Sequence, residues 1–455
     1  MAAAPILPKA MFAGRRYAVL GLARSGRAAI KALLDAGAQV LAWDRNEDAR
    51  REAGKLGGDG LTFAEPDAQR IAGFDGIVVS PGVPLNRHPI VQIAHDAGVP
   101  LMGDIELFAQ ARHTLPGHQV VAITGTNGKS TTSSLIHHLL EQAGIPTRLA
   151  GNIGNAVLAD PPLPEGGVYV LELSSYQLDV TSSLDCEVAI LLNITPDHLD
   201  RYDEGFAGYS ASKAQLFRMQ HRGTMAIVDR ASLDEIAPVR RALDTRSPIV
   251  IEDVTLPGSQ SDWPALQGPH NLCNASAAVA AVRRLGLEEA DIVAGLASFP
   301  GLPHRMQMVC ETGGVAFYND SKATNPASAA PALAAFAPAG DRARVHWILG
   351  GLAKTETLDE CEGFLGNVAA AYTIGEAGDM FARLLDGRVP VTRCELLGAA
   401  VRAASDAARD GDIVLLSPAC ASFDQFRDYE KRGYAFIQLV TAICDDRRDT
   451  RSTVR

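Results

Sequence analysis

Residues 120–132 read VVAITGTNGKSTT, an apolar run followed by a glycine-rich stretch and a Gly-Lys-Ser-Thr step. The apolar run predicts a buried strand, and the pattern from Ser133 to Ala143 predicts a helix that the step opens. Backbone N–H groups in such a turn converge on phosphate oxygens, and the helix dipole favours the anion. The stretch therefore predicts a cradle for the phosphates of a nucleotide.

The side chains of the cradle suggest how the phosphates are held. Lys129 adds a positive charge for the terminal phosphates, and the hydroxyl of Ser130 or Thr131 can bind Mg²⁺. The general P-loop has a further glycine four residues before its Gly-Lys pair, and Ile123 stands there instead. This shorter form differs from that of GTPases and most motor ATPases. The residues predicted to bind ATP here are Gly125, Thr126, Asn127, Gly128, Lys129, Ser130 and Thr131.

Composition narrows the class of protein. A chain of 455 residues that is 47% hydrophobic can bury several cores, and its length suggests about three domains. The net charge of −11 argues against nucleic acid and anionic membranes as partners, and no apolar run approaches the ~20 residues of a membrane span. The seven cysteines include no CxxC pair, which predicts no disulfide framework, no zinc site and a reducing cytoplasm.

Strand and helix patterns alternate in three successive blocks. The first runs from Arg16 to about Gly103, and the second from near Gln119 to the end of a helical run at 272–285. The third begins around FPGLPHRM, residues 299–306, where prolines and a glycine indicate a linker. This order predicts α/β domains with mostly parallel sheets, whose ligands bind at the carboxyl ends of strands. The charged end, residues 444–455, predicts a frayed tail.

Three polar residues outside the cradle have two interpretations each. Glu172 ends the apolar strand of VLELSSYQLD, where it either meets solvent or binds Mg²⁺ beside the cradle. His198 follows the next strand, and its spacing alone leaves structural and functional roles equally open. Lys213, in GYSASKAQLF, is by default a lysine on the solvated face of a helix.

A series of motifs resembles the Mur ligase family, and within it the branch that adds glutamate. In chain order, from about Arg16 to Phe436, the motifs are GTNGKST, ELSSYQL, NITPDHLDRY, SKAQLF, GPHNLCNASAA, GLPHRMQ, NDSKATNP, LGG and LSPACASFDQF. The resemblance implies three α/β domains. Residues 1–103 would be a Rossmann-like domain for a UDP-linked substrate, residues 104–300 a P-loop ATPase-like domain, and residues 301–455 a Rossmann-like domain for glutamate.

The resemblance also implies a reaction. ATP would phosphorylate the alanine carboxylate of UDP-N-acetylmuramoyl-L-alanine, and the amino group of glutamate would attack the resulting acyl phosphate. A carboxylate is a poor acyl donor until its oxygen becomes a leaving group, so catalysis is mostly positioning and cationic charge on the phosphoryl group. The enzyme would be a cytoplasmic monomer of peptidoglycan-precursor synthesis. The resemblance implies D-glutamate, although the residues themselves do not distinguish the enantiomers.

Individual residues take roles from the same resemblance. The catalytic group would be Lys129, Glu172, His198 and Lys213, with Lys213 matching a carbamylated lysine. Two Mg²⁺ ions would lie near Ser130, Glu172, His198 and the carbamate. Further contacts to ATP would come from Asn271, Asn274, Arg305 and Asp320. The UDP-linked substrate would meet Arg24, Ser25, Asp44, Gly82 and Asn152. Glutamate would meet Lys322, Thr324, Lys354, Ser422 and Phe423.

The sequence weighs against several alternatives without removing them. In GLARSG, Ala23 replaces the middle glycine of a dinucleotide fingerprint, which argues against a nicotinamide cofactor. Another Mur ligase or a folylpolyglutamate synthetase-like enzyme is the first rival. The Asp-Asn-Pro-Arg signature expected of a Mur ligase that adds diaminopimelate or lysine is absent, and a folylpolyglutamate synthetase does not need the first block. A P-loop NTPase switch is the rival from another class, and Arg305, Asp320 and Lys322 argue against it.

Overall fold

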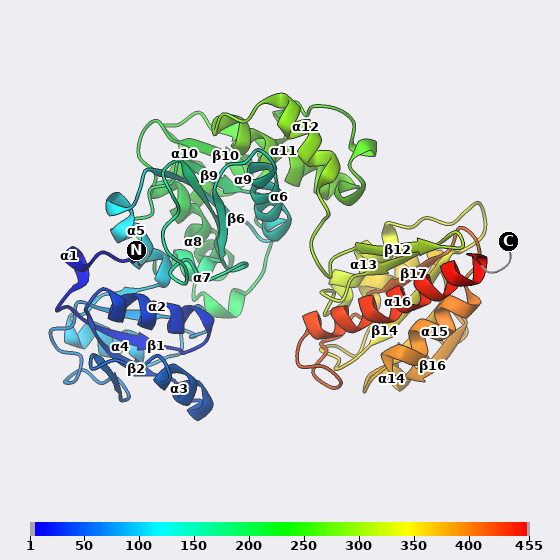
Figure 1. Ribbon diagram of the computed structural model, residues 1–455, viewed down its shortest axis with the longest axis horizontal. Helices are drawn as coiled ribbons and strands as arrows, with labels where there is room; N and C mark the ends of the chain where they lie inside the picture. The colour runs from blue at the N-terminus through cyan, green and yellow to red at the C-terminus, as the bar shows by residue number, and fades with distance from the viewer. Residues whose placement is uncertain (1–4, 453–455) are drawn as a thin grey trace. The chain divides into compact units, whose positions relative to one another are not determined.

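The protein is described by a computed structural model that covers residues 5–452, with side chains for residues 5–445. Contacts divide the chain into two compact units, Met1–Phe299 and Pro300–Arg455. Within the described residues, the first unit contains two sheets and the second contains one, each flanked by helices (Figure 1). The predicted α/β class with three domains is confirmed.

The first sheet is parallel and has the strand order β3-β2-β1-β4-β5. Its elements are α1 (Lys9–Phe12), β1 (Arg16–Leu20), α2 (Arg24–Asp35), β2 (Gln39–Trp43), α3 (Glu47–Gly54), β3 (Leu61–Phe63), β4 (Gly76–Val79), α4 (Ile90–Ala97) and β5 (Leu101–Met102). Alternate side chains of β1 enter different cores. Tyr17 and Val19 pack in the cluster that contains the buried face of α2, and Ala18 and Leu20 pack in the cluster of α4.

The second sheet is also parallel, in the order β11-β10-β9-β6-β8-β7. Its strands are β6 (His118–Thr124), β7 (Thr147–Gly151), β8 (Gly167–Glu172), β9 (Val188–Leu191), β10 (Met225–Val228) and β11 (Ile249–Val250). The helices are α5 (Asp104–Ala111), α6 (Lys129–Gln142), α7 (Ser175–Leu178), α8 (Phe206–Arg218), α9 (Arg230–Glu235), α10 (Ala237–Leu243), α11 (Pro269–Arg284) and α12 (Glu289–Ser298). Short 3₁₀ turns are η1 (Arg112–Thr114), η2 (Leu199–Arg201), η3 (Ile251–Asp253), η4 (Gln260–Asp262) and η5 (Pro264–Leu266). Because β6 lies between β9 and β8, the cradle opens at the middle of this sheet.

Helix α5 joins the two sheets of the first unit. Its buried Glu106 accepts backbone N–H bonds from Ser182 (2.7 Å) and Ser183 (3.0 Å) with one carboxylate oxygen. The other oxygen accepts the Ser183 hydroxyl at 2.7 Å. One continuous core contains Val19 of the first sheet, Phe108 of α5 and Ala122 of the second sheet. The loop after α7 is therefore held against the connection between the two sheets.

The sheet of the second unit has the order β12-β13-β17-β14-β15-β16, with β12 antiparallel to β13 and the other pairs parallel. Its strands are β12 (Gln307–Thr312), β13 (Val315–Asn319), β14 (Val345–Gly350), β15 (Val368–Ile374), β16 (Val391–Glu395) and β17 (Ile413–Leu416). Helices α13 (Pro326–Ala334) and α14 (Gly378–Leu385) pack in one core with η6 (Asp359–Asn367), and α15 (Leu397–Ala407) and α16 (Tyr429–Ser452) pack in the other. Figure 1 shows α15 and α16 together over the sheet.

The charged C-terminal stretch is not a frayed tail over most of its length. Helix α16 continues to Ser452, so the prediction is wrong up to that residue, and residues 453–455 lie outside the described chain. Phe436 and Val440 are buried in the turns before the charged stretch. A helix that packing has already nucleated can propagate into polar sequence, because each added residue gains a backbone hydrogen bond.

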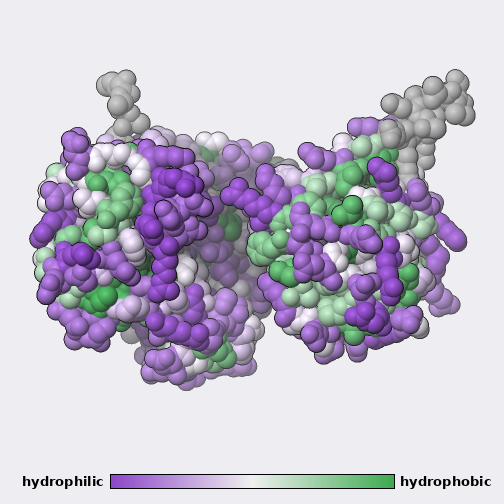
Figure 2. Space-filling view, turned by 90° about the horizontal axis from the view of Figure 1, so that it is seen from below, coloured by the Kyte–Doolittle hydropathy of each residue, from purple (hydrophilic) through white to green (hydrophobic). Residues whose placement is uncertain are grey.

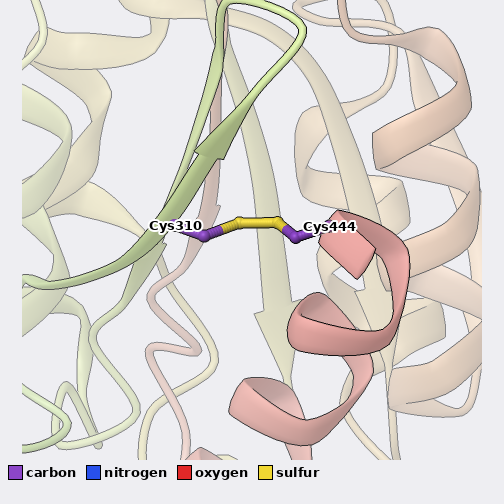
Figure 3. The surroundings of a disulfide bond; sticks show 2 residues. All are labelled: Cys310 and Cys444. Atoms are coloured by element: carbon purple, nitrogen blue, oxygen red, sulfur yellow. A yellow bond between two sulfur atoms is a disulfide. The ribbon is translucent and has the colours of Figure 1, made fainter. Parts of the chain in front are cut away.

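A disulfide joins Cys310 of β12 to Cys444 of α16 (Figure 3). The sequence predicted no disulfide framework, and this single pair was not foreseen. The two residues are separated by 134 positions, and their Cα atoms lie 7.1 Å apart, just beyond the usual range of ~4.4–6.8 Å. Spacing along the chain could not reveal the pair, because the fold alone brings the edge strand beside the last helix. The five other cysteines are free.

The surface carries no large apolar face in the view of Figure 2, where hydrophilic residues surround small, separate groups of hydrophobic ones. Within the described residues, no helix is long and apolar enough to cross a membrane.

Candidate active site

The phosphate cradle is a tight turn between β6 and α6. Gly125 and Gly128 have φ of 150° and 85°, values that L side chains rarely adopt. A Cβ atom on Gly128 would lie 2.3 Å from Oδ1 of Asn274, because the first turns of α11 pack directly against the cradle. Helix α6 begins at Lys129, so the N–H groups of its first turn face the end of β6. Glycine is required at position 128 for both backbone conformation and space.

The loop after β9 clamps the cradle from its other side. The side chain of Asn193 accepts the Asn127 N–H at 2.9 Å and donates to the Asn127 carbonyl at 3.0 Å. The Thr126 N–H donates to the Asn193 carbonyl at 2.8 Å, and the Thr126 hydroxyl lies 3.0 Å from that of Tyr209. Sequence reasoning missed Asn193 and Tyr209. Asn193 was detectable, because it lies two residues after the end of a strand that neighbours the cradle strand.

Two lysines converge on one carbonyl of the cradle. Lys129 donates to the carbonyls of Gly125 (2.8 Å) and Thr126 (2.9 Å). Lys213, on α8, also donates to the Gly125 carbonyl at 2.8 Å, and its side chain is buried. The default interpretation of Lys213 as a solvated helix-face lysine is therefore wrong. Tertiary packing turns this position of α8 toward the cradle.

The environment of Lys213 disfavours its charged form. Burial, and then the positive charge of Lys129, lower the pKa of Lys213 to about 7, against the opposing effects of Asp197, Asp179 and Glu172. Its ammonium group also lies 4.7 Å from the centre of the Tyr209 ring. Near neutral pH a large fraction of this side chain is thus an uncharged amine, which is the nucleophilic form.

Glu172 presents a partly unsatisfied carboxylate beside the cradle. It ends β8 in register with Ile123 of β6 and is only 1% exposed. One carboxylate oxygen accepts the Asn152 side-chain amide at 2.7 Å, and the other has no hydrogen-bond partner among the described residues. A buried carboxylate oxygen without a donor fits a Mg²⁺ ligand. Ser130, also buried, lies in the first turn of α6.

The remaining predicted metal residue, His198, is in a different environment. Its side chain is 52% exposed and its φ is 51°. The ring lies 5.3 Å from that of Tyr176, and Nε2 lies 3.6 Å from a carboxylate oxygen of Asp197. The described residues contain no cluster of three His, Cys, Asp or Glu side chains able to hold a metal. A role for His198 near Mg²⁺ stays a prediction.

The asparagines predicted to contact the nucleotide form a chain on α11. Asn274 donates to Asn271 at 3.1 Å and accepts the hydroxyl of Thr132 at 3.3 Å. Asn271 in turn donates to the Gln267 carbonyl at 3.1 Å. Asn274 is buried against the cradle, whereas Asn271 is half-buried. Both predicted residues therefore lie on the helix that packs against the phosphate turn.

A second glycine-rich turn follows β1 and contains the residues predicted to meet the UDP-linked substrate. A Cβ atom on Gly26 would lie 1.9 Å from the Gly21 carbonyl, so the helix approaches the strand end too closely for a side chain. The carboxylate of Asp44 accepts the Leu22 N–H at 2.7 Å. Arg24 is exposed in the first turn of α2.

The other predicted substrate residues divide between two places. Ser25 lies on α2 beside Arg24, and Gly82 is exposed in the loop after β4, whose Ser80 donates to the Gly21 carbonyl at 2.7 Å. Asn152, by contrast, lies with Glu172 at the second sheet. A substrate that touches both groups must extend from the first sheet to the second.

In the second unit, Asp320 is buried at the end of β13. Its carboxylate accepts the Ser417 hydroxyl at 2.7 Å and the Met306 N–H at 3.1 Å, which holds the segment containing Arg305. Burial raises the pKa of Asp320 to about 7, although these hydrogen bonds and Arg305 oppose the rise. Arg305 and Asp320, the two residues of this unit predicted to contact ATP, thus lie close to each other.

The residues predicted to bind glutamate lie on three loops of the second unit, after β13, β14 and β17. Nζ of Lys354 lies 3.5 Å from the Thr324 hydroxyl, and the ammonium of Lys322 lies 5.9 Å from the centre of the Tyr429 ring. Ser422 is buried, whereas Phe423 is 69% exposed. The structure brings Lys354 and Thr324 together and leaves Phe423 at the surface.

Comparison with known proteins places this architecture in a family. Residues 15–103 match the MurD-like N-terminal domain of Mur ligases, residues 123–242 the Mur ligase middle domain, and residues 304–420 the glutamate ligase domain of Mur ligases. The chain is 57% identical over 439 residues to the UDP-N-acetylmuramoylalanine--D-glutamate ligase of Novosphingobium aromaticivorans, covering 96% of each chain. The chain belongs to the Mur ligase family. The enzyme of the same name from Zymomonas mobilis is 49% identical, covering 95% of this chain and 99% of its own.

Solved structures agree on the fold. The Mur ligase MurC of Thermotoga maritima, a UDP-N-acetylmuramate-alanine ligase, has a TM-score of 0.57 at 17% identity, covering 94% of this chain and 99% of its own. MurF of Acinetobacter baumannii has a TM-score of 0.58 at 16% identity, covering 88% and 91%. The predicted resemblance is confirmed, and the chain is an ATP-dependent ligase of a family that uses ATP and Mg²⁺. A P-loop switch protein is thereby excluded.

Proposed function

We propose that the enzyme joins D-glutamate to the alanine carboxylate of UDP-N-acetylmuramoyl-L-alanine, converting ATP to ADP and phosphate. The relatives with 57% and 49% identity are named for this activity, and this chain aligns with nearly their whole length. The observation that carries the proposal in this chain is the cradle with two lysines on the Gly125 carbonyl. At such a site the charge of Lys129 can stabilise a phosphoryl group that transfers between two oxygens, and the buried amine of Lys213 is placed for the carbamate proposed below.

The protein's own residues would act mainly by holding and orienting. The first N–H groups of α6 and the ammonium of Lys129 would bind the terminal phosphates, and Asn271 and Asn274 would contact the nucleotide from α11. The clamp of Asn193 on Asn127 and Thr126 fixes the cradle before ATP arrives, so little ordering remains at the moment of reaction. In the proposed arrangement, Arg305 and Asp320 supply further ATP contacts from the second unit.

Mg²⁺, when bound, would neutralise charge on the phosphate oxygens. Ser130 and Glu172 are proposed to hold one ion, because the Glu172 oxygen that lacks a donor among the described residues is suited to a hard cation. A second ion is proposed near His198 and a carbamate on Lys213. Asn152 would keep the Glu172 carboxylate oriented through its 2.7 Å hydrogen bond.

The carbamate on Lys213 would form from the neutral amine and CO₂. The amine nitrogen attacks the carbon of CO₂, an N–C bond forms, and one proton leaves the nitrogen, which converts a basic side chain into an anion. Two observations support this step: the pKa of Lys213 is lowered to about 7 mainly by burial, and Lys129 lies close enough to favour a negative charge.

The substrates are proposed to divide among three domains. Residues 1–103 would bind the UDP portion through Arg24, Ser25, Asp44 and Gly82, and residues 104–300 would bind ATP, with Asn152 toward the sugar. Residues 301–455 would bind glutamate through Lys322, Thr324, Lys354, Ser422 and Phe423. An amino acid with two carboxylates needs cationic and hydroxyl partners, which these loops contain. A cytoplasmic, monomeric enzyme completes the proposal.

The test is a product assay with defined substrates. The enzyme is incubated with ATP, Mg²⁺, UDP-N-acetylmuramoyl-L-alanine and either D- or L-glutamate. The products are identified by mass spectrometry, and the amount of ADP formed is measured. The expected product is the glutamyl adduct, formed with D-glutamate only and equimolar with ADP. Hydrolysis of ATP without an adduct, or an adduct with L-glutamate, would contradict the proposal.

A further inference from the structure

Arg432 is a buried cation at the start of α16. Its side chain is 1% exposed. Nε donates to the Ser321 hydroxyl at 3.0 Å, and Nη2 donates to the carbonyls of Ser321 and Cys420, both at 2.9 Å. Nη1 donates to the Ala421 carbonyl at 3.3 Å. Four of the five N–H groups of the guanidinium are therefore engaged with hydroxyl and carbonyl oxygens.

No carboxylate neutralises this charge among residues 5–445, where side chains are described, since none forms an ion pair with Arg432. Asp424 acts on it only at a distance, and the Asp424 carboxylate accepts the Glu376 N–H at 3.1 Å. Burial lowers the pKa of Arg432 to about 10, which still leaves it charged at neutral pH. Buried charges are normally paired, so an unneutralised guanidinium leaves a net positive charge at this place, which favours the binding of an anion nearby.

The guanidinium bonds to the loops after two adjacent strands and lies close to the loop after a third. Ser321 follows β13, and Cys420 and Ala421 follow β17, which lies between β13 and β14 in the sheet. Gly351 follows β14, and a Cβ atom there would lie 3.1 Å from Nη1 of Arg432. Leu352 and Ala421 exchange backbone hydrogen bonds of 2.9 and 3.0 Å between two of these loops. Arg432 thus bonds to the loops after β13 and β17 and lies beside the loop after β14, which is itself bonded to the loop after β17.

The same loops contain every residue proposed above for the amino-acid substrate. Lys322 and Thr324 follow Ser321, Lys354 follows Gly351 and Leu352, and Ser422 and Phe423 follow Ala421. We propose that Arg432 is a positioning residue for the amino-acid substrate, which fixes the three loops relative to one another and gives them a positive charge that favours an acidic amino acid. The inference rests on the proposed function, because it takes glutamate as the molecule that these loops bind.

Two contributions of Arg432 can be separated by substitution. Lysine keeps the positive charge but cannot reach the same set of acceptors, because its ammonium is a compact group without the guanidinium fork. Methionine replaces the unbranched stem as far as Nε and carries no charge. If charge and geometry both serve glutamate, the Michaelis constant for glutamate should respond to both changes, whereas that for the UDP-linked substrate should not.

The experiment compares Arg432→Met, Arg432→Lys and a control, Lys431→Met, which removes a positive charge from the exposed neighbouring position of α16. For each full-length enzyme, kcat and the KM for D-glutamate, ATP and UDP-N-acetylmuramoyl-L-alanine are measured, together with Tm. Arg432→Met should raise the KM for D-glutamate about tenfold or more, with the KM for the UDP-linked substrate within about twofold. Arg432→Lys should raise the KM for D-glutamate about threefold, and the control should leave it unchanged.

Distinct outcomes overturn distinct ideas. A folded Arg432→Met enzyme whose KM for D-glutamate stays within about twofold of the unsubstituted value overturns the inference, as does an equal rise of all three KM values. Should Arg432→Met fail to fold, Arg432→Lys decides, because an unchanged KM for D-glutamate in that variant removes the positioning role. An unsubstituted enzyme that makes no adduct with D-glutamate refutes the proposed function itself, and the inference with it.

Discussion

Two glycine-rich turns of the first unit, 21–26 after β1 and 125–129 after β6, share one backbone design and differ in the charge around them. Each leads from the end of an inner parallel strand into a helix whose first N–H groups can bind an anion. Around the first turn, Arg24 is exposed and the Asp44 carboxylate bonds to the backbone. Around the second, Lys129 and buried Lys213 bond to the same carbonyl.

In the proposed function this difference has a reason, because the first turn only binds a substrate whereas the second also takes part in phosphoryl transfer. A pyrophosphate that is only held keeps its charge throughout the reaction, so an exposed arginine and backbone donors suffice. A phosphoryl group that is transferred redistributes charge, and the ammonium of Lys129 and a metal ion held by the proposed carbamate on Lys213 would stabilise that change where water screens charge poorly. The predictions below test whether the second turn governs turnover and the first governs binding.

The largest effect is expected for Lys129→Ala. Loss of an electrostatic stabiliser of the transferring group should lower kcat about 10²–10³-fold, or ~3–4 kcal/mol, with Tm nearly unchanged because Lys129 is not in a core. Steady-state kinetics and thermal unfolding measure both. The matched control is Lys31→Ala on α2, which loses one exposed ion pair to Asp35. Comparable kcat values for the two variants would contradict the proposal that the cradle binds the phosphates of ATP.

Lys213→Ala should be the next most damaging change, with kcat reduced about 10²-fold through loss of the proposed anionic ligand. Added acetate or another short carboxylate should restore part of the activity, because it can occupy the vacated position. Lys213→Arg should not be rescued, since a guanidinium fills the space and stays charged. Full activity of the alanine variant without additive would leave Lys213 with a structural role only.

The carbamate also predicts a dependence on pH and CO₂. Because the pKa of Lys213 is lowered to about 7, chiefly by burial, the reactive amine is the minority form below pH 7 and the majority form above it. In CO₂-depleted buffer, activity should therefore fall, and bicarbonate added so that dissolved CO₂ is equal at both pH values should restore it faster at pH 8 than at pH 6. Activity that is indifferent to bicarbonate at both values would count against the modification.

Gly128→Ala should give a smaller but clear loss. The new methyl group would meet Asn274 at 2.3 Å, and the residue would keep a φ of 85°, so stability should fall by about 1–3 kcal/mol and kcat with it. Gly144→Ala is the matched control, because its φ of 72° is similar and no atom lies within 4 Å of its added Cβ. Equal losses of Tm in both variants would mean that backbone strain, and not the contact with α11, accounts for the effect.

The smallest effect on turnover is expected at the first turn. Arg24→Ala should raise the KM for the UDP-linked substrate about tenfold while kcat stays within about twofold, because the exposed side chain contributes binding that is equal in ground and transition states. Arg27→Ala, also exposed on α2, is the control. A fall in kcat without a change in KM would contradict the division of work between the two turns.

Sequence reasoning succeeded where local pattern decides the structure. The apolar runs of β6, β8 and β14 and the glycine turns at 21–26 and 125–128 follow from periodicity and backbone sterics. It failed where the environment of a residue is set by elements that are distant in the chain. The burial of Lys213 depends on how α8 packs, and the engagement of Arg432 depends on loops as far apart in the chain as those of Ser321 and Cys420, so neither spacing nor residue type revealed them.

The bond between Cys310 and Cys444 closes residues 310–444 of the second unit into a covalent ring. The bond lies at the edge strand of the sheet. Between these two residues lie β13 to β17 and most of α16, so nearly all of that unit is inside the ring. A protease that cuts any one loop of the ring would leave both fragments attached to each other, and they would separate only after a reductant is added. Electrophoresis of clipped enzyme with and without reductant therefore reads the oxidation state of this pair directly.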